Sequence, residues 1–173
     1  DQGTRAIASS EAFVVSNVHL ARSIEGPGKF VSATPADIAP GKAVLLYGEF
    51  ENFLSICEEP GDERENTYRR CFSASLKLIS ASGKEVDRLD FLPESRGVHV
   101  GSAPVEIVNF WARYRIPATL KSGTYTLVVE GKDVLGGKSA TTTMEIEVPR
   151  SGKPPSAAEG QDTEDAGRPM RII

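Results

Sequence analysis

Apolar residues that recur at every second position are the feature that most constrains the fold of this chain. Such a period is typical of β-strands, because successive side chains of a strand point to opposite faces. Phe110, Ala112 and Tyr114, for example, alternate with Trp111 and Arg113. No segment of helical length shows a helical period. We predict strands at 12–20, 28–32, 43–56, 71–80, 85–91, 104–116, 124–131 and 139–148.

Glycine-containing turns separate these segments. Pro40–Gly41, Ser82–Gly83 and Gly136–Gly137 each adjoin a predicted strand, and glycine adopts the backbone conformations that tight hairpins need. Seven to eight antiparallel strands with such turns predict an all-β chain, folded as an immunoglobulin-like β-sandwich with Greek-key connections. Tyr125 opens a strand after the short crossover 120–124, as in a tyrosine corner, where the hydroxyl bonds the backbone a few residues upstream.

The periodic pattern covers only part of the 173 residues. Residues 1–11 are polar and aperiodic, so we predict a flexible N-terminus. Residues 12–149 form the predicted sandwich domain. Residues 150–173 are rich in Pro, Gly and Ser, which predicts a disordered tail. The apolar end of this tail, 170–173, has the composition to add a strand to a sheet edge of another subunit.

Charge and hydropathy narrow the classes of partner. The net charge is −4, with 20 basic and 24 acidic residues, so we expect no nucleic-acid binding. No apolar run approaches the length of about 18 residues that a membrane-spanning helix needs. The N-terminus lacks a signal-peptide pattern, and we expect that any signal peptide has been removed.

Two cysteines, Cys57 and Cys71, flank a polar loop between two predicted strands. If they are cross-strand partners, Ile56 faces Phe72 and Leu54 faces Ala74, so that apolar residues share one face. This register places the two sulfurs side by side, and we predict a disulfide. A disulfide persists in an oxidising compartment, which predicts a periplasmic, cell-surface or secreted protein. Two independent cytosolic thiols are the competing interpretation.

The recognisable signatures of metal, nucleotide and nucleophile chemistry are absent from the sequence. The acidic loop 58–65 lacks the alternating aspartates of a calcium loop, and its arginines neutralise part of its charge. Two cysteines without a histidine at ligand spacing leave a zinc site incomplete. We therefore predict no catalytic residue, no metal and no cofactor.

The outward residues of the strand near 104–116 are the leading candidate contact surface. They are Asn109, Trp111, Arg113 and Arg115. Trp and Arg are enriched at the centres of protein interfaces, and Trp also stacks on sugar rings. The competing interpretation is that the N-terminal segment or a loop covers Trp111, because a large indole is usually mostly buried.

The irregular segment 92–103 is the second candidate, because it carries Arg96 and His99 at what we expect to be one end of the sandwich. An ordinary crossover between strands is the competing interpretation. A hydrolase assembled around His99 with acidic partners stays open as a less favoured function, since catalytic triads are defined by geometry rather than by sequence position.

Two stretches resemble known families. The segment 120–139 resembles the closing hairpin of bacterial secreted immunoglobulin-like domains. The segment Pro40–Phe53 is similar to a motif of uncharacterised planctomycete extracytoplasmic proteins, at Pro40, Gly41, Val44, Leu45, Tyr47, Glu49 and Asn52. The resemblance implies a sandwich fold and an exported setting, and it implies no reaction, ligand or catalytic residue.

Together these observations predict a non-catalytic, exported interaction or structural module. We expect it to bind a protein partner through a sandwich face or its end loops. A carbohydrate-binding module that uses Trp111 is the alternative within binding.

Overall fold

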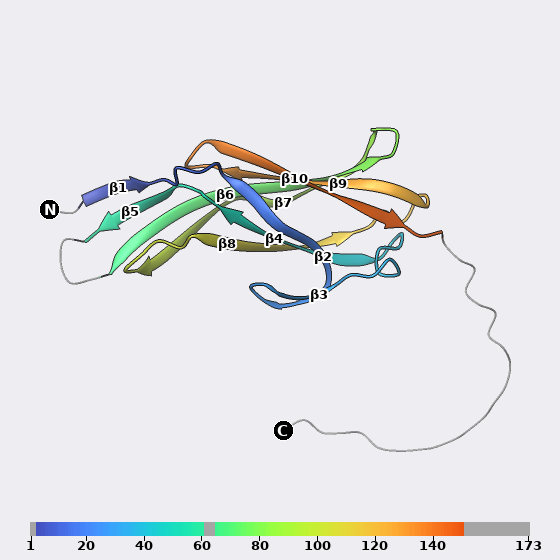
Figure 1. Cartoon of the computed structure of the whole chain (residues 1–173), viewed down its shortest axis with the longest axis horizontal. Coiled ribbons are helices and arrows are strands. Elements are labelled where there is room, and N and C mark those ends of the chain that lie inside the picture. Colours follow the sequence, from blue (N-terminus) through green and yellow to red (C-terminus); the bar gives the residue numbers. More distant parts are fainter. Residues whose placement is uncertain (1–2, 61–64, 151–173) are drawn as a thin grey trace, which may run out of the picture.

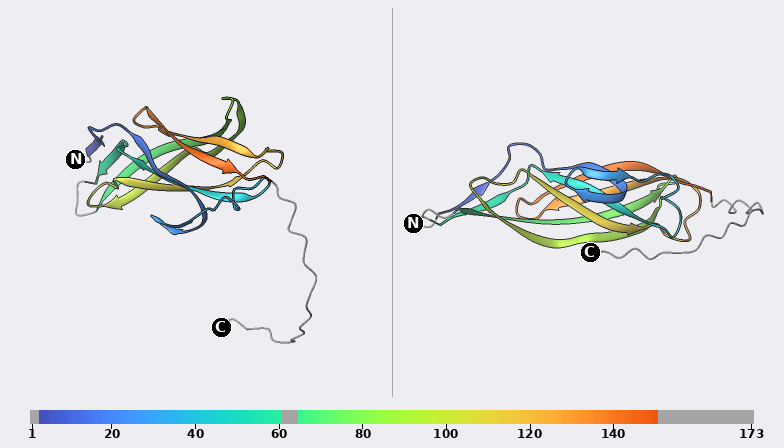
Figure 2. Two further views of the ribbon diagram at one scale, coloured as in Figure 1. Left: turned by 45° about the vertical axis from the view of Figure 1, so that its right-hand side comes forward. Right: turned by 90° about the horizontal axis from the view of Figure 1, so that it is seen from below.

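The computed structural model describes residues 3–60 and 65–150 of the chain. These residues form ten strands arranged in two antiparallel sheets, the two layers of a β-sandwich (Figures 1 and 2). The six-stranded sheet contains β1 (Gly3–Ile7), β5 (Ser55–Glu59), β6 (Asn66–Ser80), β7 (Glu85–Gly101), β9 (Gly123–Asp133) and β10 (Lys138–Val148). The four-stranded sheet contains β2 (Val14–Gly26), β3 (Lys29–Ser32), β4 (Ala43–Glu51) and β8 (Ile107–Arg115).

The long strand β6 organises the six-stranded sheet. It pairs with β7 along one edge, and on the other edge it pairs first with β5 and then with β9. In the four-stranded sheet, β4 lies between β2 and β8. Non-consecutive strands are therefore neighbours in both sheets, and the connection from β8 to β9 passes from one sheet to the other.

Aromatic rings from both sheets meet at the centre of the sandwich. The ring centroids of Phe50 on β4 and Phe72 on β6 are 4.7 Å apart, and Phe110 on β8 lies 4.6 Å from Phe50. Two glycines make this packing possible. A side chain at Gly48 would collide with the Phe110 ring, and one at Gly131 would lie 2.8 Å from the Phe50 ring.

The structure confirms the all-β sandwich and seven of the eight predicted strands in outline, but it adds strands where the sequence predicted none. Ten strands are described instead of seven to eight. Residues 3–7, predicted as flexible, form β1, which pairs with β5. Residues 92–101, predicted as irregular, continue β7 along β6. Main-chain hydrogen bonds hold these edge strands, so their side chains need no apolar period.

The predicted strand 43–56 is two strands in different sheets. Asn52, with a φ of 60°, interrupts it between β4 and β5. A positive φ is sterically unfavourable for most residues and is tolerated best by Gly, Asn and Asp. The Asn52 side chain donates to the Ala12 carbonyl at 3.0 Å, which holds the bend against the start of β2.

The predicted tyrosine-corner hydrogen bond is present. The Tyr125 hydroxyl donates to the Lys121 carbonyl at 2.9 Å, four residues upstream, and the ring is buried. The bond fixes the chain where it passes from β8 in one sheet to β9 in the other. The predicted tail 150–173, with its apolar end, lies outside the described residues except for Arg150.

The predicted register of the two cysteines is wrong. Cys57 lies opposite Tyr68, three residues from Cys71. Three residues span about 10 Å along a strand, whereas a disulfide needs Cα atoms within about 7 Å. An odd offset also places the two side chains on opposite faces of the sheet. Both thiols are free and buried in the structure, so the predicted Cys57–Cys71 disulfide is absent.

This register predicts that the cysteines react as free thiols once the chain is unfolded. A chain unfolded without reductant should take up two alkyl groups by intact mass, and the folded chain should react slowly because both thiols are buried. Labelling that requires a reductant would contradict the register.

Asp133, which is fully buried at the end of β9, ties two turns together. Its carboxylate accepts hydrogen bonds from the Leu54 amide at 2.9 Å and from the Gly136 amide at 3.0 Å. It thereby joins the bend before β5 to the β9–β10 turn. Gly136 gives the carboxylate its space, since a Cβ there would collide with it.

We predict that Asp133→Ala destabilises the fold substantially. The substitution leaves two backbone amides without their acceptor, at about 1 to 3 kcal/mol for each buried group left unsatisfied. Urea unfolding measures the loss, and Asp90→Ala, at an exposed aspartate of β7, serves as the matched control. Equal stability of the two variants would show that Asp133 does not fix the turns.

Candidate binding face

The outward residues of β8 are placed as the sequence predicted. Phe110, Ala112 and Tyr114 are buried, whereas Trp111, Arg113 and Arg115 are exposed. Trp111 is 66% exposed, so in the described residues neither the N-terminal segment nor a loop covers it. An indole this open in the middle of an edge strand is unusual, because Trp is highly buried on average.

Cross-strand register sets Trp111 in an aromatic row on the outer face of the four-stranded sheet. Tyr47 on β4 lies between His19 on β2 and Trp111 on β8. Phe30, from the β2–β3 hairpin, packs over this row, with its ring 4.6 Å from His19 and 5.2 Å from Tyr47. We call His19, Phe30, Tyr47 and Trp111 the aromatic row. Tyr47 is buried and Phe30 is half-buried, whereas the two ends of the row, His19 and Trp111, are exposed.

A polar network centred on the buried side chains of Tyr47 and Glu49 lies beside the aromatic row. The Tyr47 hydroxyl donates to the Glu49 carboxylate at 2.6 Å, and the Asn109 side-chain amide donates to the Tyr47 hydroxyl at 2.7 Å and to Glu49 at 3.2 Å. Asn17, at an irregularity of β2, donates to the other Glu49 oxygen. The Gly28 amide of the β2–β3 hairpin donates to the Tyr47 hydroxyl at 2.8 Å.

This network has a structural consequence for the candidate face. The Tyr47 hydroxyl and both Glu49 carboxylate oxygens are hydrogen-bonded within the protein. The network therefore stabilises the candidate face and does not present Glu49 as a free carboxylate. It orients Asn109, two residues from Trp111, and seats the β2–β3 hairpin on the sheet. Burial, together with the hydrogen bond to Glu49, raises the pKa of the Tyr47 hydroxyl.

A cleft of about 290 Å³ opens between β7 and β8, the edge strands of the two sheets. It brings together Trp111, Asn109 and Arg96, which the sequence had assigned to two separate candidate sites. Arg70 of β6, which the sequence analysis missed, also lines it. Its remaining walls include the apolar side chains of Phe50, Phe72, Leu92, Val108 and Phe110. On the opposite side of the sandwich, the Thr142 hydroxyl of β10 donates to the Val15 carbonyl of β2, which joins the two sheets there.

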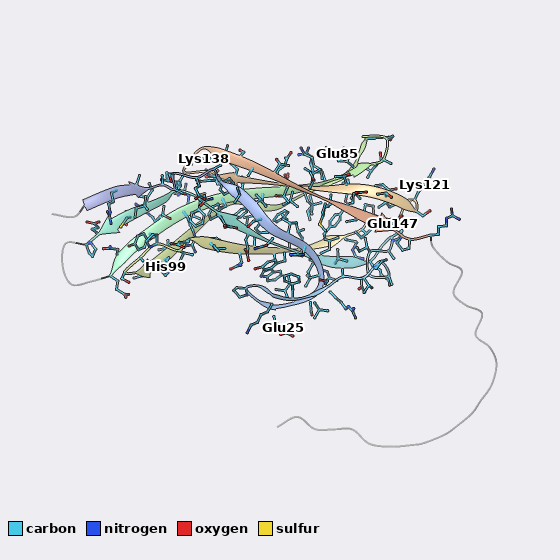
Figure 3. All side chains as sticks on the ribbon, viewed as in Figure 1. Glu25, Glu85, His99, Lys121, Lys138 and Glu147 are labelled. Atoms are coloured by element: carbon cyan, nitrogen blue, oxygen red, sulfur yellow. The ribbon has the colours of Figure 1, made fainter. Side chains whose placement is uncertain are left out.

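The remaining sequence candidates are not part of this cleft. His99 lies on β7 at the end of the sandwich that carries β1 and β5 (Figure 3), half-buried, with its ring 6.1 Å from Tyr68. In the β6–β7 ladder, His99 is opposite Tyr68 and Arg96 is opposite Cys71. His99 and Arg96 are three positions apart on β7, so their side chains point to opposite faces of the sheet. Arg115 donates to the Gly41 carbonyl at 2.8 Å and so anchors a turn.

The part of the chain that the structure describes shows neither a membrane-spanning helix nor a metal-binding cluster. No described helix is long and apolar enough to cross a bilayer. Within the same residues, no three His, Cys, Asp or Glu side chains are grouped as metal ligands.

Comparisons with known proteins give no family for this chain. No protein-family model and no curated protein matches it. Among solved structures, it is similar to part of a family 123 glycoside hydrolase from Clostridium perfringens, described in work on glycolipid glycan hydrolysis. The two are 11% identical with a TM-score of 0.43, over 88% of this chain and 28% of the hydrolase chain. The chain thus spans less than a third of the hydrolase, and a likeness at this level carries no argument about activity.

The buried tyrosines predict that stability falls as the pH rises above about 10, the ordinary pKa of tyrosine. Burial raises the pKa of Tyr47 and of Tyr114, whose hydroxyl donates to Asp87. Above that pH the unfolded chain loses protons that the folded chain keeps, so the free energy of unfolding decreases with pH. Urea unfolding across this range measures the effect. Tyr47→Phe should make the decrease shallower, and an unchanged slope would exclude Tyr47 as a source.

Proposed function

We propose that the chain is a non-catalytic binding module that contacts a protein partner through the outer face of the four-stranded sheet, with Trp111 at the centre of contact. The observation that carries this proposal is that the Trp111 indole is 66% exposed, while its neighbours Tyr47 and Asn109 are held in place by hydrogen bonds. Aromatic and arginine residues held on a rigid support are typical of the few residues that dominate binding energy.

The rigid packing of the residues next to Trp111 favours a role in binding as the explanation for its exposure. Tyr47, its cross-strand neighbour, is 1% exposed and joined to Glu49, Asn109 and the β2–β3 hairpin by hydrogen bonds. A rigid platform loses little conformational entropy when a partner binds. The exposed Ile107 at the start of β8, which is 45% exposed, extends the apolar surface along the same face.

The local charge indicates what kind of partner fits. The chain carries a net charge of −4, yet Arg70, Arg96 and Arg113 lie in or beside the β7–β8 cleft. Complementary charge speeds association and excludes partners of the same sign. An acidic protein surface therefore suits this side of the molecule.

A carbohydrate ligand is the second candidate, because an open indole beside the Asn109 amide offers a stacking face and a polar contact. The hydrolase alternative draws no support from the site, since no hydrogen bond joins His99 to a carboxylate among the residues described. The exported setting stays within the proposal, and without the disulfide it rests on the family resemblance.

We predict that Trp111→Ala weakens binding at least tenfold, equivalent to about 1.4 kcal/mol, while the fold stays as stable as before. A photoreactive amino acid at position 111 would first identify the partner by cross-linking among the exported and envelope proteins of the source organism. The same probe at Val86, a 38% exposed position of β7, is the control. Affinities for the purified partner are then compared for Trp111→Ala and Val86→Ala.

The result has three possible forms. A partner cross-linked at position 111 alone, with affinity lost only in Trp111→Ala, supports the proposal. Equal cross-linking at both positions, or an unchanged affinity, contradicts it. Binding on a glycan array that depends on Trp111, with no protein cross-link, would replace the protein partner by a carbohydrate.

A further inference from the structure

Arg70 is a cation on the inner face of the six-stranded sheet. Its neighbours two residues away on β6, Tyr68 and Phe72, are both buried, so the alternation of the strand directs Arg70 to the same side. It lines the β7–β8 cleft together with Phe50, Phe72 and Phe110. Arg70 is therefore a charged residue at a position of the strand where an apolar core residue is expected.

The backbone opposite Arg70 provides room for its side chain. Its cross-strand neighbour on β7 is Gly97. A Cβ at that position would lie 3.0 Å from the Arg70 Nε and 3.3 Å from its Cγ, closer than side chains normally pack. The side chain therefore passes over Gly97 toward the part of the cleft that Trp111 lines.

Arg70 also lacks the partners that other arginines of the chain have. Arg5, Arg22, Arg69 and Arg88 each form an ion pair, with Glu59, Asp37, Glu58 and Glu85 respectively. Among the described residues, no carboxylate lies within 4.0 Å of the Arg70 guanidinium, and no acceptor is hydrogen-bonded to it. Burial lowers the pKa of Arg70, which shows that its surroundings disfavour the charge without compensating it.

An uncompensated cation in a partly apolar cleft is unfavourable by itself and becomes favourable when an anion enters. The planar guanidinium presents parallel N–H donors that match a carboxylate. The apolar walls disfavour a multiply charged group, because the cost of removing charge from water rises steeply with charge. They suit a single carboxylate on a short aliphatic stem, such as a Glu side chain.

We propose that the β7–β8 cleft receives the carboxylate of an acidic side chain of the protein partner, paired with Arg70, while Trp111 packs against the residues next to it. This inference rests on the proposed function and specifies the chemistry that the same site recognises. Arg70 supplies the selectivity for an acid, and Trp111 supplies the contact area.

The test uses peptides displayed as a random library and selected on the intact chain. We expect the selected peptides to contain an Asp or Glu that is required for binding. Synthetic copies with Asn or Gln at that position should bind at least tenfold more weakly to the wild-type chain. Arg70→Gln should bind the acidic and amide peptides equally, whereas Arg88→Gln, at an arginine paired outside the cleft, should keep the wild-type preference.

Folding and charge are controlled separately. Urea unfolding should show that Arg70→Gln is at least as stable as the wild type, because the substitution removes an uncompensated charge. Arg70→Lys keeps the charge but loses the planar fork, so it should retain only part of the preference for an acid.

The outcomes separate the two proposals. Peptides whose binding requires Trp111 but shows no preference for an acid would overturn the carboxylate site and leave the binding face in place. An acid preference that persists in Arg70→Gln would also overturn it. A library that yields no binding peptide, together with binding to oligogalacturonate, would overturn the protein partner and the acidic side chain alike.

Discussion

The stacking of Phe50 on Phe72 is the contact on which the rest of the sandwich depends. The two rings belong to β4 and β6, which are interior strands with a hydrogen-bonded neighbour on each side. The ring centroids are 4.7 Å apart. Phe13, Phe53 and Phe110 pack against one or both of them. Buried aromatic rings of this kind contribute most of the apolar area of a core, and here they set the spacing and the relative orientation of the two sheets.

The same alternation that sends Phe50 inward determines the candidate binding face. On β4, Tyr47 and Glu49 point outward on either side of Gly48, which is backed by Phe110. The outward pair then anchors Asn109 and the β2–β3 hairpin, and Trp111 ends the row at the edge of the sheet. The same alternation of side chains along β4 and β8 therefore produces both the core and the candidate binding face. The cleft opens where the edge strands β7 and β8 lie beside each other without forming hydrogen-bonded pairs.

The sequence predicts what alternation controls and misses what register and main-chain hydrogen bonds control. The two faces of β8, the sandwich and the Tyr125 bond follow from local pattern. β1 and the second half of β7 have polar or exposed side chains and are held by their partners' backbones, which no local pattern reveals. The predicted register of the cysteines is wrong because the apolar residues of β5 and β6 can be aligned in more than one register. Arg70 was overlooked, although its place between Tyr68 and Phe72 in an alternating strand marks it as inward.

The central claim, that the face around Trp111 is open and ready for a partner, is tested most directly by the fluorescence of this residue, the single Trp of the chain. The folded protein without partner should show the red-shifted emission of an indole in water, and acrylamide should quench it almost as efficiently as it quenches the unfolded chain. Blue-shifted emission that resists acrylamide would mean that another part of the molecule covers Trp111, and it would contradict the account.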